Sequence, residues 1–408
     1  FTSKDPNQAV SGTFSYALSC GCPIVSTPIP HALEVLKNDA GIIIDFENPA
    51  KLSEAVTGLL NDKVIRNNIS SNGLHRIAPT AWENSAIAHA MLFNKAGKLQ
   101  SDLSYKIPEI NLDHIKRLTT ETGMIQFSKL NCPDLDSGYT LDDNARALIA
   151  MCQHYQLTKN ADDLVYIQTY LDFIKFCQQP DGNFLNYVDK QRLFTKQNDE
   201  VNLADAYGRT IWALGFAISL KSVLPSEIIT EADLIIQKAL VNAASIHSTR
   251  AMAFTIKGLF YNNTIQRKAG KIALIRKLAD RLVQMFRHES DKNWRWYESY
   301  LTYANGILPE ALLLAWLATG DLAYKEISKL TFDFLLTKTF NKKRIHVISN
   351  IGWLYKDQPA YPDTIGAQQP IDVSYTIIAL NSFYAVFKNH EYLDKMQIAF
   401  NWFLGNNH

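Results

Sequence analysis

The sequence predicts a mainly α-helical protein, in which a six-hairpin α/α toroid is preceded by a partial Rossmann-like α/β lobe. Residues 1–62 alternate helix and strand signals in the order α-β-α-β-α, which is typical of a parallel sheet. From Asp113 onward, long amphipathic helices replace the strand signals. The loops between these helices alternate short and long, which favours a ring of helix hairpins with its functional loops at one end.

The chain length of 408 residues suits two domains. We place the α/β lobe at residues 1–98 and the toroid at 112–408. The polar stretch between them, 99–111, contains Pro108 and is predicted to be a linker.

The α/β lobe is predicted from short, well-punctuated segments. Helices are expected at 12–19, 31–37 and 49–61, strands at 23–27 and 41–45, and further helix over 63–98 with a break at Pro79. Because an open sheet needs several αβ steps, we expect the chain to begin inside a domain.

The toroid is predicted from eleven amphipathic segments. They are 113–121, 142–155, 161–178, 205–220, 226–245, 248–261, 268–287, 305–318, 322–338, 372–386 and 391–404. A helix at 83–97 brings the number to twelve, which is six hairpins. The long loops are 122–141, 179–204, 288–304 and 339–371.

An internal repeat supports the ring. Asp142-Asp-Asn-Ala-Arg146 aligns with Asp205-Ala-Tyr-Gly-Arg209, and both segments open a helix after a long polar loop. Arg250, in Ser-Thr-Arg-Ala-Met-Ala-Phe, repeats the arginine without the aspartate. A spacing of about 45–65 residues matches one helical hairpin.

Composition excludes several classes of protein. A net charge of +1 provides no strong field for nucleic acid or an anionic membrane. No apolar run reaches the length of a membrane span, and the first residues do not resemble a signal peptide. The five cysteines are odd in number and suit a reducing compartment, so we predict a cytoplasmic protein. Cys20-Gly-Cys22 lacks the spacing of a zinc site, and we predict no metal and no cofactor.

Residues 7–60 resemble the C-terminal domain of retaining GT-B glycosyltransferases of the large family-4 type. The matching segments are Ser19-Cys-Gly-Cys-Pro-Ile-Val-Ser-Thr27, Glu34-Val-Leu36, Gly41-Ile-Ile-Ile and the helix 49–60. The resemblance implies that a helix N-terminus, here Ser11, Gly12 and Thr13, faces the donor diphosphate through its backbone N–H groups.

The sequence departs from this family at two positions. Gln8 and Tyr16 stand where the family usually carries two glutamates. Gln8 can still hydrogen-bond a sugar hydroxyl, whereas Tyr16 cannot replace a carboxylate on a ribose. The acceptor-binding GT-B domain is also missing from this sequence, so residues 1–98 are expected to be a structural remnant of a nucleotide-sugar site.

The helical half resembles α-toroid carbohydrate-active domains attached to such glycosyltransferases. The matching segments are 138–146, 205–209, 296–305, 369–372 and 402–407. The resemblance covers nearly the whole half and implies an oligosaccharide or sugar ligand.

Carboxylates at the starts of inner helices would converge at one face of a toroid, and glycosidic bond cleavage needs two of them. Asp142, Asp143, Asp205, Glu298 and Asp372 lie at such positions. Asp142 and Asp205 each precede an arginine by four residues, so the alternative is a helix cap with an ion pair. The same cap reading applies to Asp372. Asp143 has no arginine at that spacing and faces another side of the helix, so a functional role stays open for it beside a structural one.

Glu298 is the predicted proton donor. In an extended segment, Trp294, Trp296 and Glu298 share one face, where indoles could stack on a pyranose and desolvate the carboxyl. We predict Asp143 or Asp205 as the base, and Asp372 is a further catalytic candidate. The other predicted substrate-binding residues are Tyr139, Arg146, Tyr207, Arg209, Tyr303 and Asn305.

The sequence therefore predicts a carbohydrate-active protein of glycosyltransferase descent whose toroid processes a glycan by acid/base attack on a glycosidic bond. Phosphorolysis, with an arginine holding phosphate, is a variant. One alternative is a non-catalytic module that binds a glycan or positions an acceptor. Another is a glycosyltransferase completed by a separate N-terminal piece, which would bind a nucleotide sugar.

Overall fold

The computed structural model describes residues 1–97, 107–129, 132–350, 352–357 and 368–406. The chain forms two compact units, Phe1–Lys106 and Ile107–His408. The change from one unit to the other falls within the segment predicted as linker.

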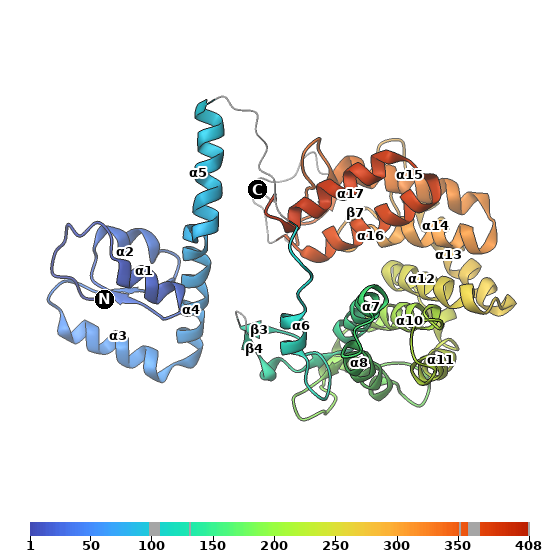
Figure 1. The fold of residues 1–408 in the computed structure, drawn as a ribbon, viewed down its shortest axis with the longest axis horizontal. Coiled ribbons are helices and arrows are strands. Elements are labelled where there is room, and N and C mark those ends of the chain that lie inside the picture. Colours follow the sequence, from blue (N-terminus) through green and yellow to red (C-terminus); the bar gives the residue numbers. More distant parts are fainter. Residues whose placement is uncertain (98–106, 130–131, 351, 358–367, 407–408) are drawn as a thin grey trace. The chain divides into compact units, whose positions relative to one another are not determined.

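The first unit follows the predicted α-β-α-β-α order (Figure 1). Its elements are α1 (Gly12–Ser19), β1 (Val25–Ser26), α2 (Pro30–Val35), β2 (Ile42–Ile43), α3 (Pro49–Asn61), α4 (Lys63–Ile77), η1 (Ala78–Thr80) and α5 (Trp82–Gly97). The strands β1 and β2 pair in parallel, with Val25 opposite Ile42. Two small hydrophobic clusters form its core, one beneath α1 and α2 and one between the strands and α3 and α4.

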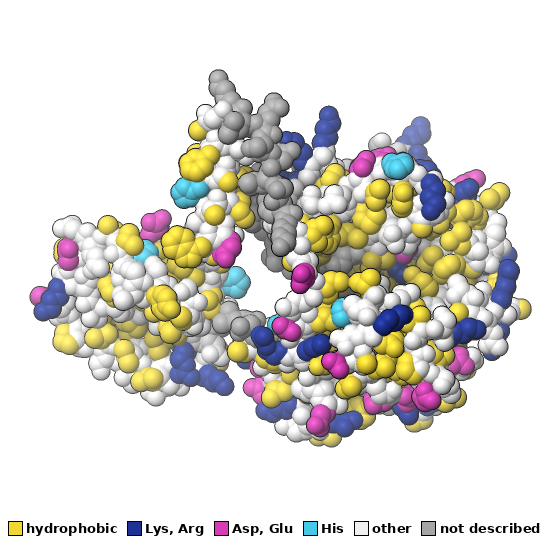
Figure 2. Space-filling model, in the orientation of Figure 1, with side chains coloured by type: hydrophobic (Ala, Val, Ile, Leu, Met, Phe, Trp, Pro, Cys, Tyr) yellow, Lys and Arg dark blue, Asp and Glu magenta, His cyan; other side chains and the backbone are white. Residues whose placement is uncertain are grey.

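The helix α5 has no buried residue. Trp82, Met91, Leu92 and Phe93 are all exposed, and hydrophobic side chains are visible on its surface in Figure 2. The helix predicted at 83–97 as the twelfth of the ring corresponds to α5. It lies in the first compact unit, within the predicted lobe at 1–98, so counting it as a ring helix is wrong.

The second unit contains five long helix hairpins among its described residues. They are α7 (Leu141–Thr158) with α8 (Asp163–Cys177), α10 (Ala204–Ser219) with α11 (Ser226–Ala239), α12 (Thr249–Ile265) with α13 (Ala269–Glu289), α14 (Ile307–Thr319) with α15 (Leu322–Thr339), and α16 (Pro370–Phe387) with α17 (His390–Phe403). Within the described ranges, no helix combines the length and hydropathy that a membrane span needs.

The remaining elements of this unit are short. They are α6 (Asp113–Leu118), β3 (Ser128–Lys129), β4 (Cys132–Pro133), η2 (Leu135–Ser137), β5 (Tyr139–Thr140), β6 (Tyr187–Val188), α9 (Gln197–Glu200), η3 (Ala243–Ser245), β7 (Tyr300–Leu301) and β8 (Leu354–Tyr355). Two antiparallel pairs, β5–β6 and β7–β8, each join two of the long loops, whereas β3 and β4 pair within one loop.

The first helix of each hairpin faces the middle of the ring. The inner helices α7, α10, α12, α14 and α16 pack in this order, each against the next, while each outer helix packs on its own partner. Most residues of α10, α12 and α14 are buried, whereas α11 and α13 bury one apolar stripe. This difference is the one expected between a helix surrounded by protein and a helix at the surface.

The inner helices α10 and α12 make the most extensive helix–helix contact of the molecule. Their backbones meet at Gly215 and Gly258, where a Cβ on Gly215 would lie 2.1 Å from the Gly258 carbonyl oxygen. Gly208 repeats this close approach against Ala251. The absence of side chains at these positions therefore allows the short distance between α10 and α12.

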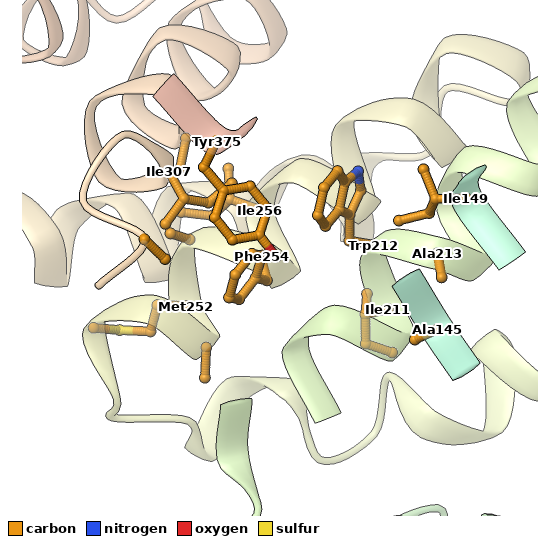
Figure 3. Close-up of a cluster of buried hydrophobic side chains, with 14 of the residues drawn as sticks. Ala145, Ile149, Ile211, Trp212, Ala213, Met252, Phe254, Ile256, Ile307 and Tyr375 are labelled. Atoms are coloured by element: carbon orange, nitrogen blue, oxygen red, sulfur yellow. The ribbon is translucent and has the colours of Figure 1, made fainter. Parts of the chain in front are cut away.

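An aromatic cluster fills the ring below the helix starts. Trp212 of α10 stacks on Phe254 of α12, and Tyr375 of α16 contacts both rings, with centroid distances of 5.9 and 5.6 Å (Figure 3). Residues far apart in the sequence thus form one aromatic cluster. The polar groups at the helix starts lie next to this cluster.

Candidate active site

Charged and hydroxyl side chains from the starts of the inner helices and the loop before α14 gather in one group, here called the ring cluster. Its members are Asp142, Asp143, Arg146, Asp205, Arg209, Arg250, Glu298, Tyr303, Asp372 and Tyr375. The five hairpins bring these residues together, although they span more than two hundred positions of the sequence.

Two arginines share one carboxylate at the edge of the cluster. Arg209 donates to Asp142 at 2.9 Å, and Arg146 lies 2.5 Å from Asp143 and 3.4 Å from Asp142. Thr140 also donates to Asp143, at 2.5 Å. Asp143 has no arginine four residues on, as the sequence shows, but Arg146 reaches it at a spacing of three residues.

The predicted pairing of each aspartate with the arginine four residues on holds only for Asp142 and Arg146. Arg209 contacts Asp142 from the neighbouring helix, since α7 and α10 pack side by side. The predicted caps are also not formed, because the N-cap residues of α7, α10 and α16 are Thr140, Leu203 and Gln369.

The Arg250 guanidinium holds Glu298. Its Nη1 lies 3.1 Å from both carboxylate oxygens, and the Thr249 hydroxyl donates to one of them at 2.6 Å. Arg250 Nε donates to the Tyr303 carbonyl and Nη2 to Thr302. Glu298 is thus bound as an ion pair, which does not suit the predicted role of a free proton donor.

Asp205 is held by hydroxyl groups. Ser248 donates to one carboxylate oxygen at 2.7 Å, and the Tyr303 hydroxyl donates to the other. Among the described residues, no arginine or lysine forms an ion pair with it. Two hydroxyl groups therefore orient the Asp205 carboxylate, and no described arginine or lysine pairs with it.

Asp372 is 8% exposed and lies in the first turn of α16. The Ala304 backbone N–H donates to its Oδ1 at 2.5 Å, whereas Oδ2 has no hydrogen-bond partner among the described atoms. Burial raises the pKa of Asp372 to about 7, against the opposing effects of the Ala304 N–H and the Arg250 charge. A carboxyl with this pKa exchanges its proton near neutral pH.

The dipeptide Tyr303-Ala304 joins these last two carboxylates. Tyr303 contacts Asp205 through its hydroxyl, and the next residue contacts Asp372 through its backbone N–H. Ala304 has a positive φ of 51°, an uncommon conformation for a residue with a Cβ. The tight turn therefore links two carboxylates that form no ion pair with the described residues.

The predicted indole walls are not formed. Trp296 is fully buried, Trp294 is 4% exposed, and both rings pack near Phe334 of α15. Trp294 Nε1 also donates to the Glu298 carbonyl at 2.6 Å. Both indoles face the core, so neither is available to stack on a sugar.

Three other predicted binding residues also have structural partners. Tyr139 is buried and its hydroxyl contacts Thr120 at 3.0 Å, while the buried Tyr207 donates to the Ala239 carbonyl at 2.6 Å. Asn305 bonds the backbone of Thr302 through both ends of its amide. The structure places Arg146, Arg209 and Tyr303 in the ring cluster and these three outside it.

A buried ion pair between Lys257 and Glu310 joins the inner helices near the cluster. Lys257 of α12 contacts both oxygens of Glu310 at 2.8 and 2.7 Å, and Ser382 of α16 donates to the same carboxylate. Lys257 Nζ also lies 4.3 Å from the Trp212 ring centre. Both charged side chains are 1% exposed, so they connect the inner helices rather than meet a ligand.

Tyr375 belongs to the site, although the sequence did not single it out. It follows Asp372 by three positions, so both side chains lie on the same face of α16. The Tyr375 hydroxyl is buried without a partner among the described atoms and interacts electrostatically with Arg146 and Arg209. The spacing from Asp372 at the start of an inner helix is the signal that could have found it.

In the first unit, the predicted nucleotide-sugar residues make local contacts. Ser11 caps α1 by accepting from the Phe14 N–H at 3.3 Å, and its own N–H lies 3.4 Å from His31 Nδ1. Thr13 contacts the Ser11 hydroxyl, Gln8 accepts from Ser3, and Gly12 opens the helix. The N-terminus of α1 is thus capped by its own side chains.

Comparisons with known proteins agree with this division of the chain. Residues 15–76 match the family model for glycosyl transferases group 1. A comparison with curated proteins gives no match. Within the described residues, no group of three or more His, Cys, Asp or Glu side chains is arranged to hold a metal ion.

Several solved structures share the fold. A D-mannose isomerase has a TM-score of 0.52 at 14% identity, over 73% of this chain and 84% of that chain. Cellobiose 2-epimerase from Bacillus thermoamylovorans has a TM-score of 0.55 at 12% identity, over 71% of this chain and 83% of that chain. A sugar epimerase from a ruminal bacterium has a TM-score of 0.54 at 12% identity, over 71% of this chain and 82% of that chain.

These similarities confirm the mainly α, toroidal fold class. The chain joins a segment similar to glycosyl transferases group 1 to a toroid whose fold is that of carbohydrate-processing enzymes.

Proposed function

We propose that the toroid processes a glycan by acid/base attack on a glycosidic bond, with Asp372 as proton donor and Asp205 as the second carboxylate. The supporting observation is the turn at Tyr303-Ala304, which links two carboxylates that form no ion pair with the described residues. Such a pair is the minimum that glycosidic cleavage requires. The solved structures of similar fold include enzymes named for sugars, which supports a sugar ligand.

Asp372 replaces Glu298 as the proposed acid for a physical reason. A general acid near neutral pH needs a carboxyl that is still protonated there, and burial provides this for Asp372. Glu298 instead forms an ion pair with Arg250, and this pair favours the ionised carboxylate over the protonated acid.

The direction of approach follows from the space around Asp372. On one side the carboxyl borders a cavity of about 10 Å³, lined by Asn305, His346 and Thr376 among others. That volume holds about one water molecule and no sugar ring. We therefore place the sugar on the side of Tyr303 and Asp205, next to the partly exposed Asp142, Asp143 and Arg146.

A non-catalytic glycan-binding role is the second candidate. It is favoured by the pairing of Asp142, Asp143 and Glu298 with arginines, because such pairs orient hydroxyl-binding groups without supplying a free acid.

Product analysis separates the two functions. We expect the full chain to convert at least one oligosaccharide of a mixed panel, the Asp372→Asn variant to lose that conversion, and Glu298→Gln to retain part of it. Unchanged conversion by Asp372→Asn would remove the acid assignment.

Completion by a separate glycosyltransferase piece remains a prediction. It requires the first unit to bind a nucleotide sugar, and titration calorimetry of the full chain with UDP-glucose and GDP-mannose measures this directly. The absence of heat with both donors would argue against it.

A further inference from the structure

We propose that the ring cluster selects an uncharged sugar and discriminates against uronic acids and sugar phosphates. This inference rests on the proposed function and names its substrate class. It sets aside the phosphate-binding variant that the repeated arginines first indicated.

The charges of the cluster favour a neutral ligand. Three guanidiniums, from Arg146, Arg209 and Arg250, face five carboxyl groups. The carboxyl groups belong to Asp142, Asp143, Asp205, Glu298 and Asp372. The sum is negative whether Asp372 is protonated or ionised. An anionic ligand would therefore enter a negative field at a partly desolvated site, where charge repulsion is weakly screened.

Two of the three arginines, Arg209 and Arg250, are also engaged by protein groups. Arg250 uses Nε, Nη1 and Nη2 for protein acceptors, and its guanidinium stacks 5.0 Å from the Tyr303 ring centre. Arg209 is bound to Asp142 and lies 5.0 Å from the Phe254 ring centre. Stacking and ion pairing hold these two planes, so an anion could bind Arg250 Nη1 or Arg209 Nη1 only by displacing a carboxylate.

The unpartnered polar atoms match a hydroxyl group instead. Arg209 Nε, the Tyr375 hydroxyl and Asp372 Oδ2 are buried without hydrogen-bond partners among the described atoms. Their residues are 6%, 4% and 8% exposed. Together they offer a fixed donor, a hydroxyl that donates or accepts, and a carboxyl oxygen. A sugar hydroxyl both donates and accepts, so it can satisfy this mixed set, whereas an ionised phosphate or carboxylate mainly accepts.

The test is titration calorimetry of the full chain with matched pairs of neutral and anionic saccharides. The pairs are mannose with mannose 6-phosphate, glucose with glucose 6-phosphate, and cellotriose with its glucuronic acid trimer. We expect the neutral member to bind at least about 10-fold more tightly, which is about 1.4 kcal/mol. In the Asp142→Asn variant, which removes one charge and releases two arginines, the preference should shrink several-fold. Asp162→Asn, at an exposed position just before α8, should leave it unchanged.

Each outcome decides a different point. Tighter binding of neutral sugars, reduced by Asp142→Asn, supports the inference. Equal or tighter binding of the anionic members overturns it and leaves the proposed glycan processing intact. No binding by any saccharide overturns both.

Discussion

At the scale of single residues, the site depends on which carboxylates have a cation and which do not. Asp142, Asp143 and Glu298 are paired with arginines, while Asp205 and Asp372 are held by hydroxyl and backbone donors. The sequence could identify all five as candidates because four lie at or next to helix starts and Glu298 lies in the loop before α14. It could not show which of them are paired, since Arg209 and Arg250 reach Asp142 and Glu298 from other elements of the fold.

Arg250→Met tests the ion pair with Glu298. Both side chains are less than 10% exposed, so removal of the guanidinium leaves a buried charge. We expect a loss of about 3–5 kcal/mol in the free energy of unfolding, measured by urea denaturation. The double variant Arg250→Met/Glu298→Gln should recover part of it. A loss below about 1 kcal/mol in the single variant would contradict this account.

Asp372 should make stability depend on pH. Its folded-state pKa of about 7 exceeds the usual value of 3.8, because burial disfavours the charged form. Between these values the folded protein retains a proton that the unfolded chain releases, so the free energy of unfolding falls as pH rises from about 4 to 7. Asp372→Asn removes this contribution, which is at most about 4 kcal/mol. Urea denaturation across this pH range should show a smaller decline in the variant; equal declines would place the Asp372 pKa near its ordinary value.

At the scale of elements, most helices follow from the sequence. The predicted segments 12–19 and 49–61 match α1 and α3, and most ring helices agree within a few residues because their apolar periodicity is strong. The segment predicted at 226–245 is longer than α11, which ends at Ala239. The orientation of the loop at 294–298 could not be predicted. Alternation places Trp294, Trp296 and Glu298 on one face but does not say whether that face meets solvent or the core.

The glycine contact between α10 and α12 gives a prediction at this scale. Gly215→Ala should lower the free energy of unfolding by about 1–3 kcal/mol, because the added Cβ would lie 2.1 Å from a backbone oxygen. Gly270→Ala on α13 is the matched control, since a Cβ added there would have no neighbour within 4 Å among the described residues. Alanine at that position should be neutral or stabilising by up to about 1 kcal/mol. Equal effects of the two changes, in a urea titration, would contradict the close approach of the helices.

At the scale of the whole molecule, each compact unit has its own hydrophobic clusters. The separation near residue 106 could be predicted from the polar stretch at 99–111. The predicted lobe at 1–98 includes α5, but the same helix also counts toward the predicted ring, because an amphipathic helix beside a linker fits either unit by its local pattern.

Every residue of the ring cluster lies in the second unit. A fragment of residues 107–408 should therefore fold cooperatively and bind the preferred neutral saccharide as tightly as the full chain does. Circular dichroism establishes the folding and calorimetry the affinity. A folded fragment that has lost binding would show that the first unit contributes to the site.

The pH dependence of kcat/KM tests the central claim most directly. With the best substrate from the panel, we predict that the rate of the full chain falls about tenfold per pH unit above about pH 7, as Asp372 loses its proton. Asp372→Asn should lose at least about 100-fold in rate and no longer show this decline. A variant that keeps both the rate and the decline would contradict the assignment of Asp372 as the proton donor.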